Sequence, residues 1–292
     1  MATIDIPEPL DRWLLNGTSL HTLAWQIEGR EGQMVAPELL SDDLPIAGWH
    51  GELDPHGQQG QQRRPFGRGT WRLNAWVLGV NPATGAVLDQ LGSLASVQAR
   101  GEEILRLLHT RSVTITHQRA DGTTRQAVGH LDGRGVEVEL NPNSPWFGRI
   151  TADFVLPDPF WYDTGSPVTV SGSFATGATI NLAPFTAASA PQRVVTVEFG
   201  PGNNPILSHA GQSLSWASVI SSGRALGIAC DPREPSLYAA AGAWTPSYLP
   251  FSYQPGPSWF ELDPAVSTAI VSHTGGGSLS VSITARLAFL TA

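Results

Sequence analysis

The sequence predicts a mainly β protein of two domains: a first β domain that carries one helix, followed by a wholly β domain. At 292 residues the chain is long for one hydrophobic core. Charged residues make up only 14% of it, and 31 Gly and 23 Pro supply the turns of a β-rich fold. Residues 1–165 hold 13 of the 17 Arg and 20 of the 25 acidic residues. We therefore place the domain boundary in the turn-forming segment 163–167, which gives domains 1–163 and 164–292.

In the first domain, the pattern of apolar residues predicts several strands. Thr70–Leu78 alternates strictly, with Trp71, Leu73, Ala75 and Val77 on one face. The Asp121-Gly122 pair predicts a hairpin turn between strands 113–119 and 124–130. Further strands are expected over residues 21–28, 135–140 and 147–156.

The helix of the first domain is predicted over residues 93–109. Apolar residues recur there at a spacing of three to four, which is typical of an amphipathic helix; they are Leu94, Val97, Ile104, Leu105 and Leu108. Ser93 is the expected N-cap, and Gly101 weakens the helix.

The second domain shows short β patterns separated by turn signals, as expected of a β-sandwich. The expected strands are 168–173, 178–182, 193–199, 213–220, 225–229 and 279–287. Residues 200–205 and 275–277 are expected to be loops because they are rich in Gly, Pro and Asn.

The composition argues against several functions. The net charge is −8 and no Lys is present, so we expect no general affinity for nucleic acid. The single Cys, Cys230, cannot form an intrachain disulfide and is expected to be a small buried residue. No nucleotide-binding, metal-binding or nucleophile motif is present, so we expect no cofactor, no metal and no enzyme activity. The N-terminus does not resemble a signal peptide, and no apolar run is long enough to span a membrane.

Ten Trp residues keep a carbohydrate-binding adhesion module open as an alternative. Aromatic rings stack on the apolar faces of sugars, and an exposed Trp or Tyr platform in residues 166–292 would favour this alternative. Trp216, Trp244 and Trp259 are the candidates, with packing in a core or an interface as the competing interpretation. A wall-degrading hydrolase would instead need two convergent carboxylates, and the sequence shows no such pair.

Two segments are candidates for contacts between subunits. Residues 51–69 hold too few apolar side chains to pack a core, and they include Arg63, Arg64, Phe66 and Arg68. We interpret this segment as an arm that reaches a neighbouring subunit or the lumen of a ring, and a plain surface loop is the alternative. The second candidate is the polar face of the predicted helix, with Arg100, Glu103 and Arg106.

Several stretches together resemble a known family. Residues 156–162, Leu-Pro-Asp-Pro-Phe-Trp-Tyr, resemble the proline–aromatic junction of distal tail proteins from long, flexible-tailed phages. The opening 13–20, the stretch 44–51 and the strand–turn pattern of 197–206 are also similar to that family. The resemblance covers nearly the whole chain, and it rests on the order and spacing of these weak motifs.

The resemblance implies a structural protein of the virion, assembled in the host cytoplasm into a hexameric ring at the phage tail tip. Its partners would be further copies of itself, the tail tube protein and the hub or tail-associated protein, with the tape measure protein as a further candidate. No nucleic-acid binding would be expected beyond DNA passage. The first domain would form the ring, and the second would be a galectin-like β-sandwich. Pro157 and Pro159 would stiffen the domain junction, which Phe160, Trp161 and Tyr162 would lock. A plain strand end is the alternative for this cluster.

Overall fold

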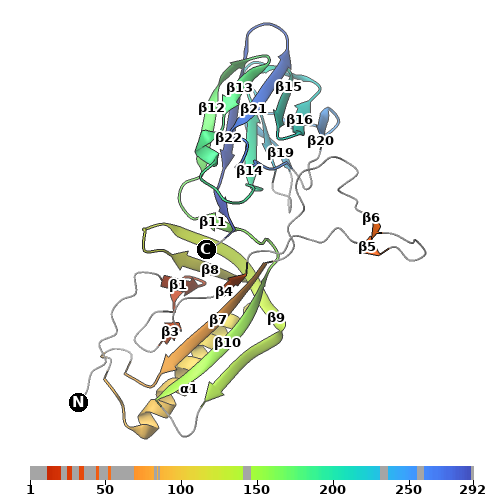
Figure 1. Cartoon of the computed structure of the whole chain (residues 1–292). Coiled ribbons are helices and arrows are strands. Elements are labelled where there is room, and N and C mark those ends of the chain that lie inside the picture. Colours follow the sequence, from red (N-terminus) through yellow and green to blue (C-terminus); the bar gives the residue numbers. More distant parts are fainter. Residues whose placement is uncertain are drawn as a thin grey trace. The chain divides into compact units, whose positions relative to one another are not determined.

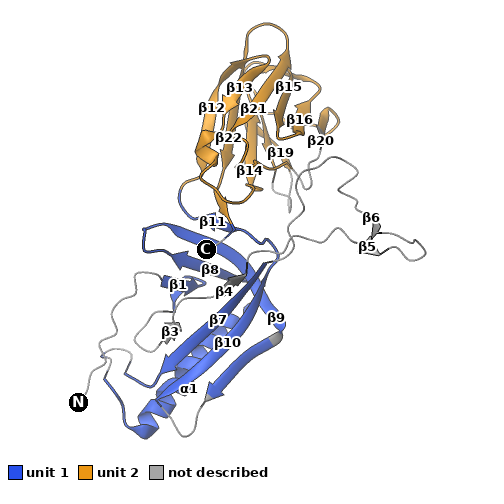
Figure 2. Cartoon of the chain, in the orientation of Figure 1, with its two compact units in different colours: residues 1–38, 66–165, 290–292 blue, residues 39–65, 166–289 orange. Residues whose placement is uncertain are grey.

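The computed structural model divides the chain into two compact units (Figure 2). Unit 1 comprises residues 1–38, 66–165 and 290–292, and unit 2 comprises residues 39–65 and 166–289. The residues that the structure describes are 12–20, 25–27, 33–35, 44–45, 52–53, 69–81, 84, 86–140, 146–230, 236–254 and 260–290.

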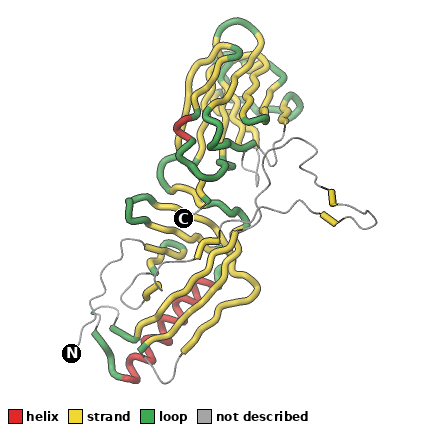
Figure 3. The backbone as a smooth tube through the Cα atoms, in the orientation of Figure 1, coloured by secondary structure: helices red, strands yellow, loops and turns green. Residues whose placement is uncertain are grey.

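Unit 1 is an antiparallel sheet with one long helix (Figures 1 and 3). Its elements are β1 (Arg12–Leu15), β2 (Thr18–Ser19), β3 (Trp25–Ile27), β4 (Gln33–Val35), β7 (Gly69–Leu78), α1 (Gln90–Leu108), β8 (Val113–Gln118), β9 (Thr124–Leu140), β10 (Phe147–Leu156) and β11 (Trp161–Asp163). The main strand order is β2-β1-β8-β9-β10-β7-β3, and β4 also pairs with β7. The short strands β5 (Leu44–Pro45) and β6 (Glu52–Leu53) pair with each other.

The alternation predicted for β7 is confirmed. Trp71, Leu73, Ala75 and Val77 are each at most 1% exposed. In β10, the buried residues Ile150, Ala152 and Phe154 lie opposite Ala75, Leu73 and Trp71. Directly opposite residues of an antiparallel pair share a face, so these side chains form one apolar layer, and α1 packs against the same two strands.

The hairpin predicted at Asp121-Gly122 is also confirmed. Gln118 pairs with Thr124, and Gly122 adopts a φ of 83°, the left-handed conformation that glycine accepts without steric cost. Asp121 Oδ1 accepts hydrogen bonds from the Thr123 hydroxyl (2.6 Å) and the Thr123 N–H (2.9 Å). These bonds favour the carboxylate and lower the pKa of Asp121.

The strands predicted over 124–130 and 135–140 are one continuous strand, β9. Its first part, through Gly129, pairs with β8, and its second part, from His130, pairs with β10. A register shift near Ala152 and Phe154 and a φ of 82° at Gly135 accommodate the change of partner. The segment between the two predicted strands is therefore an irregularity within one strand.

The helix begins earlier than predicted, at Gln90. Its N-cap is Asp89, whose Oδ1 accepts a hydrogen bond from the Gly92 N–H at 2.7 Å. Ser93, the predicted cap, is buried in the first turns, and its hydroxyl donates to the Gly79 carbonyl at 3.0 Å. A buried serine that bonds to a facing strand occupies a core position, which the apolar periodicity alone does not mark.

Replacing Gly101 with alanine is expected to stabilise the protein. Gly101 is buried within α1, and a Cβ added there would meet no atom within 4 Å. Alanine is favoured over glycine inside a helix by about 0.8–1 kcal/mol. The free energy of unfolding, measured by urea denaturation, should rise by about that amount; a fall would mean that close packing requires the glycine.

Unit 2 is a β-sandwich, as predicted. Its elements are β12 (Val168–Ala175), β13 (Ala178–Asn181), the 3-10 helix η2 (Ala183–Phe185), β14 (Val195–Phe199), β15 (Gly202–His209), β16 (Gln212–Trp216), β17 (Val219–Ile220), β18 (Ala225–Ala229), β19 (Ser236–Ala241), β20 (Phe251–Gln254), β21 (Thr268–Thr274), β22 (Ser278–Ala285) and β23 (Ala288–Phe289). One sheet has the order β12-β22-β14-β18-β19, and the other has the order β13-β21-β15-β16-β20, with β17 paired to β15.

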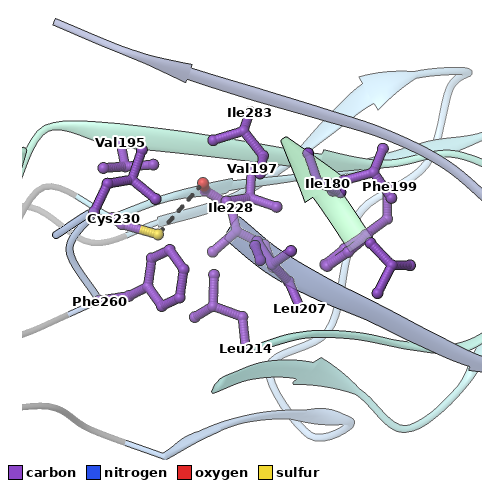
Figure 4. Close-up of a cluster of buried hydrophobic side chains, with 14 of the residues drawn as sticks. Ile180, Val195, Val197, Phe199, Leu207, Leu214, Ile228, Cys230, Phe260 and Ile283 are labelled. Carbon is purple, nitrogen blue, oxygen red and sulfur yellow. Dashed lines mark hydrogen bonds between the residues drawn. The ribbon is translucent and has the colours of Figure 1, made fainter. Parts of the chain in front are cut away.

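The core of the sandwich joins apolar side chains from both sheets (Figure 4). Val197, Ile228 and Ile283 come from the first sheet, and Leu207 and Leu214 from the second; each is at most 1% exposed. Cys230 lies in the same core, fully buried, with its thiol 3.8 Å from the Ile228 carbonyl oxygen. The expectation of a small buried residue at this position is confirmed.

Candidate assembly surface

The charged residues predicted on the helix pair within the helix. Arg100 Nη1 lies 2.5 Å from Glu103 Oε2, and Arg106 Nη2 lies 3.7 Å from Glu102 Oε2. Pairs of this kind at three or four residues' separation contribute a few tenths of a kcal/mol. Their role in subunit contacts stays a prediction, as does that of Arg63, Arg64, Phe66 and Arg68, which lie outside the described residues.

The aromatic cluster predicted for the domain junction is buried within unit 1. Phe160 and Trp161 are at most 2% exposed, and the Trp161 ring meets the Trp13 ring edge-on at 5.9 Å. The Tyr162 hydroxyl donates to Asp158 Oδ2 at 2.7 Å. Of the two prolines, Pro159 is buried and Pro157 is exposed. The role of this cluster in holding the two units together stays a prediction.

The described Trp candidates for sugar stacking pack against each other. Trp216 is 3% exposed in the sandwich core, and its ring meets the Trp244 ring edge-on at 6.1 Å. The Trp244 indole N–H donates to the Ala241 carbonyl at 3.2 Å, and the Arg224 guanidinium lies 5.7 Å from the ring centroid. These contacts favour the packing interpretation for both residues. Trp259 lies outside the described residues.

A surface that the sequence interpretation missed lies along the outer edge of β9. From His130 to Leu140, the strand pairs on one side with β10, and no described strand pairs with its other side. Val138 is 36% exposed there, and Glu137 and Glu139 are exposed as well. An edge strand presents unpaired backbone N–H and C=O groups that can pair with another chain.

Exposed aromatic side chains lie beside this edge, on the face of the sheet away from α1. The Phe147 ring meets the Trp76 ring edge-on at 5.3 Å, and the Arg149 guanidinium lies 5.9 Å from the Trp76 ring centroid. Phe147 is 36% exposed. We call Trp76, Phe147 and Arg149 the aromatic group.

The aromatic group and the β9 edge form one continuous surface. Arg149 pairs with Trp76 in β7 on one side and with Glu139 in β9 on the other. Exposed aromatic and Arg side chains are the types enriched at the centres of protein–protein interfaces. The sequence signal for this surface is Trp76 itself, because it falls on the polar side of the alternation in β7.

Neither a cluster of potential metal ligands nor a membrane-spanning helix is found among the described residues. No group of three or more His, Cys, Asp or Glu residues among them could hold a metal ion. No described helix is long and apolar enough to cross a membrane.

Together these features define a class of protein: a mainly β chain of two units, one a helix-backed sheet with an open edge and the other a β-sandwich. Among solved structures, the chain is similar to the crystal structure of the Dit protein (gp 19.1) of phage SPP1. That protein is described as a paradigm of the hub adsorption apparatus in phages that infect Gram-positive bacteria.

The similarity is one of fold along the whole length of both proteins. It covers 95% of this chain and 99% of the SPP1 protein, with a TM-score of 0.57 and 15% sequence identity. Comparisons with models of protein families and with curated protein sequences find no match. The fold thus agrees with the sequence resemblance to distal tail proteins.

Proposed function

We propose that the chain is a structural protein of a phage tail tip, which assembles through unit 1 into a ring, with six copies as the expected number. The observation that carries the proposal is the open edge of β9 beside the aromatic group, in a chain with the fold of the SPP1 protein over 95% of its length. The ring would join the tail tube protein to the hub or tail-associated protein, with the tape measure protein as a further partner. The chain would be located in the virion after assembly in the host cytoplasm.

The physical basis for ring formation is that the sheet of unit 1 has two different edges. β9 forms the outer edge next to β10, and β3 and β4 pair with the far side of β7. A contact between the β9 edge of one copy and a different surface of the next is head-to-tail, and such contacts close into rings when the rotation fits. The galectin-like sandwich would then lie outside the contact that closes the ring.

The test is the mass and shape of the purified full chain, by light scattering together with negative-stain images. A six-fold ring with a central hole is the expected result. A strictly monomeric protein, alone and in the presence of its tail tube and hub partners, would contradict the proposal.

A further inference from the structure

One row of side chains crosses the outer face of the sandwich sheet that contains β12, β22, β14, β18 and β19. The strand register places one residue of each strand in the row: Ser171, Ser282, Glu198, Gly227 and Tyr238. We call it the Tyr238 row. Successive residues of a strand point to opposite faces. Because Val197 and Ile228 point into the core, the row faces away from it.

The Tyr238 ring lies over Gly227, and its hydroxyl is hydrogen-bonded to Glu198. A Cβ on Gly227 would collide with three ring atoms of Tyr238, so the phenol occupies the space that a side chain at position 227 would need. The Tyr238 hydroxyl donates a hydrogen bond to Glu198 Oε1 at 3.1 Å. The residue is still 36% exposed, so an oriented aromatic ring remains accessible to solvent.

Within the five strands that carry it, the face around the row is polar and nearly uncharged. Glu198 is the one charged residue in the five strands of this sheet. Hydroxyl side chains flank the row, among them Thr169 and Thr284, whose Oγ1 atoms lie 2.9 Å apart. Such a face offers hydroxyls that both donate and accept hydrogen bonds, and one carboxylate that accepts them.

We propose that the Tyr238 row binds a neutral hexopyranose unit of a glycan. The apolar face of the sugar ring would lie against the exposed part of the Tyr238 ring. Sugar hydroxyls would donate to Glu198, whose second carboxylate oxygen extends the reach of the group, and exchange hydrogen bonds with Ser282 in the adjacent strand. The uncharged surroundings favour a neutral sugar over a phosphate or a nucleic acid, which would be repelled by Glu198.

The state of the phenol supports this geometry. Burial, and after it the hydrogen bond to Glu198 and the charge of Glu198, raise the pKa of Tyr238 from 10.0 to about 12. The ring therefore stays neutral and keeps its hydroxyl as a donor throughout the physiological range. Because the folded pKa is raised, the stability that this contact contributes is fully present below pH 10 and is lost as the pH rises toward 12.

This titration gives a direct check on Tyr238. Both wild-type protein and the Tyr238→Phe variant are titrated with alkali while tyrosinate absorbance is recorded. The difference between the two absorbance curves should show one tyrosine that ionises near pH 12. An ordinary titration near pH 10 in that difference would show that the Tyr238–Glu198 contact is absent in solution.

Sugar binding is tested by saturation-transfer NMR on the full chain, with methyl glycosides of glucose, galactose and N-acetylglucosamine as probes. We expect transfer to at least one glycoside, with Kd weakened about tenfold in Tyr238→Ala and in Glu198→Gln. Tyr238→Phe should retain most of the transfer because the stacking ring remains. Tyr248→Ala is the control: Tyr248 is 62% exposed and lies outside the row, and its hydroxyl accepts a hydrogen bond from the Leu237 N–H at 3.3 Å. This variant therefore also tests whether a disturbance of β19 next to Tyr238 is enough to weaken binding.

Absence of transfer from the wild-type protein to all three glycosides would overturn the proposal. Equal transfer in wild type and Glu198→Gln would also overturn it. Glu198→Gln keeps the shape of the side chain, so its result can be interpreted even if Tyr238→Ala fails to fold. Transfer that is lost only in Tyr248→Ala would place sugar binding elsewhere and would also overturn it. The experiment does not depend on ring assembly, so its failure would leave the proposed tail function in place.

Discussion

Replacing Trp71 with alanine is expected to lower the free energy of unfolding of unit 1 by about 3–5 kcal/mol. Trp71 is 1% exposed and belongs to the apolar layer on the face of β7 and β10 against which α1 packs. Its ring lies 5.4 Å from that of Trp13 and 5.3 Å from that of Phe154, so the truncation removes contacts with both and leaves a cavity between them.

Native-state hydrogen exchange can show which part of the protein loses stability, because it reports the free energy of opening for each amide. The amides of β7 and β10 should lose protection, while those of β14 and β22 in the sandwich should keep it. Arg72→Ala is the matched control. Arg72 sits next to Trp71 but points to the other face, where it pairs with Asp153 at 2.6 Å while 48% exposed, so its loss should cost less than about 1 kcal/mol. Equal effects of the two substitutions would contradict the assigned faces of β7.

Strict alternation and a strong turn signal were enough to predict β7, the β8–β9 hairpin and β10. These signals are local, because period-two burial and the Asp-Gly turn depend on neighbouring residues in the chain. β18 was predicted over the same residues for the same reason. The composition also predicted the mainly β class.

Where tertiary pairing overrides local preference, the prediction failed. Residues 200–205 were expected to form a loop, yet β15 begins at Gly202 and continues through Pro205. A register shift between Asn203 and Ile206, and a φ of 48° at Asn204, let the turn-forming residues stay in the strand. β21 was missed because Ile270, an outward-facing position, is apolar and 48% exposed, which obscures the alternation.

The candidate site was harder to predict than the fold. An open strand edge is a property of the topology. The sequence of β9 does not indicate that β8 pairs only with its first part, so that the outer edge of its second part stays open. The Tyr238 row depends on register across five strands, from Ser171 to Tyr238, and register between distant strands is fixed by tertiary pairing. Trp76, by contrast, could have been singled out as an aromatic residue on a polar face.

Substituting Phe147 with aspartate is expected to convert the assembled ring into single chains. Phe147 is 36% exposed and packs edge-on against Trp76, so the fold should tolerate the change while the centre of the proposed contact gains a charge. A carboxylate buried at an interface in place of an apolar ring is unfavourable, because its desolvation costs more than a contact with the neighbouring Arg149 returns. The mass by light scattering should fall to that of one chain.

A second variant separates the role of the edge from that of the aromatic group. Val138→Lys places a charge on the open edge of β9, a device by which natural edge strands avoid pairing with other chains. If copies join through this edge, Val138→Lys should abolish assembly as Phe147→Asp does, although it leaves the aromatic group unchanged. Ile270→Asp provides the control for Phe147→Asp, because it introduces the same negative charge at a 48% exposed position of the sandwich and should leave the ring intact. Rings that persist in both Phe147→Asp and Val138→Lys would move the subunit contact away from this face of unit 1 and toward the other predicted surfaces, the helix α1 or the segment 51–69.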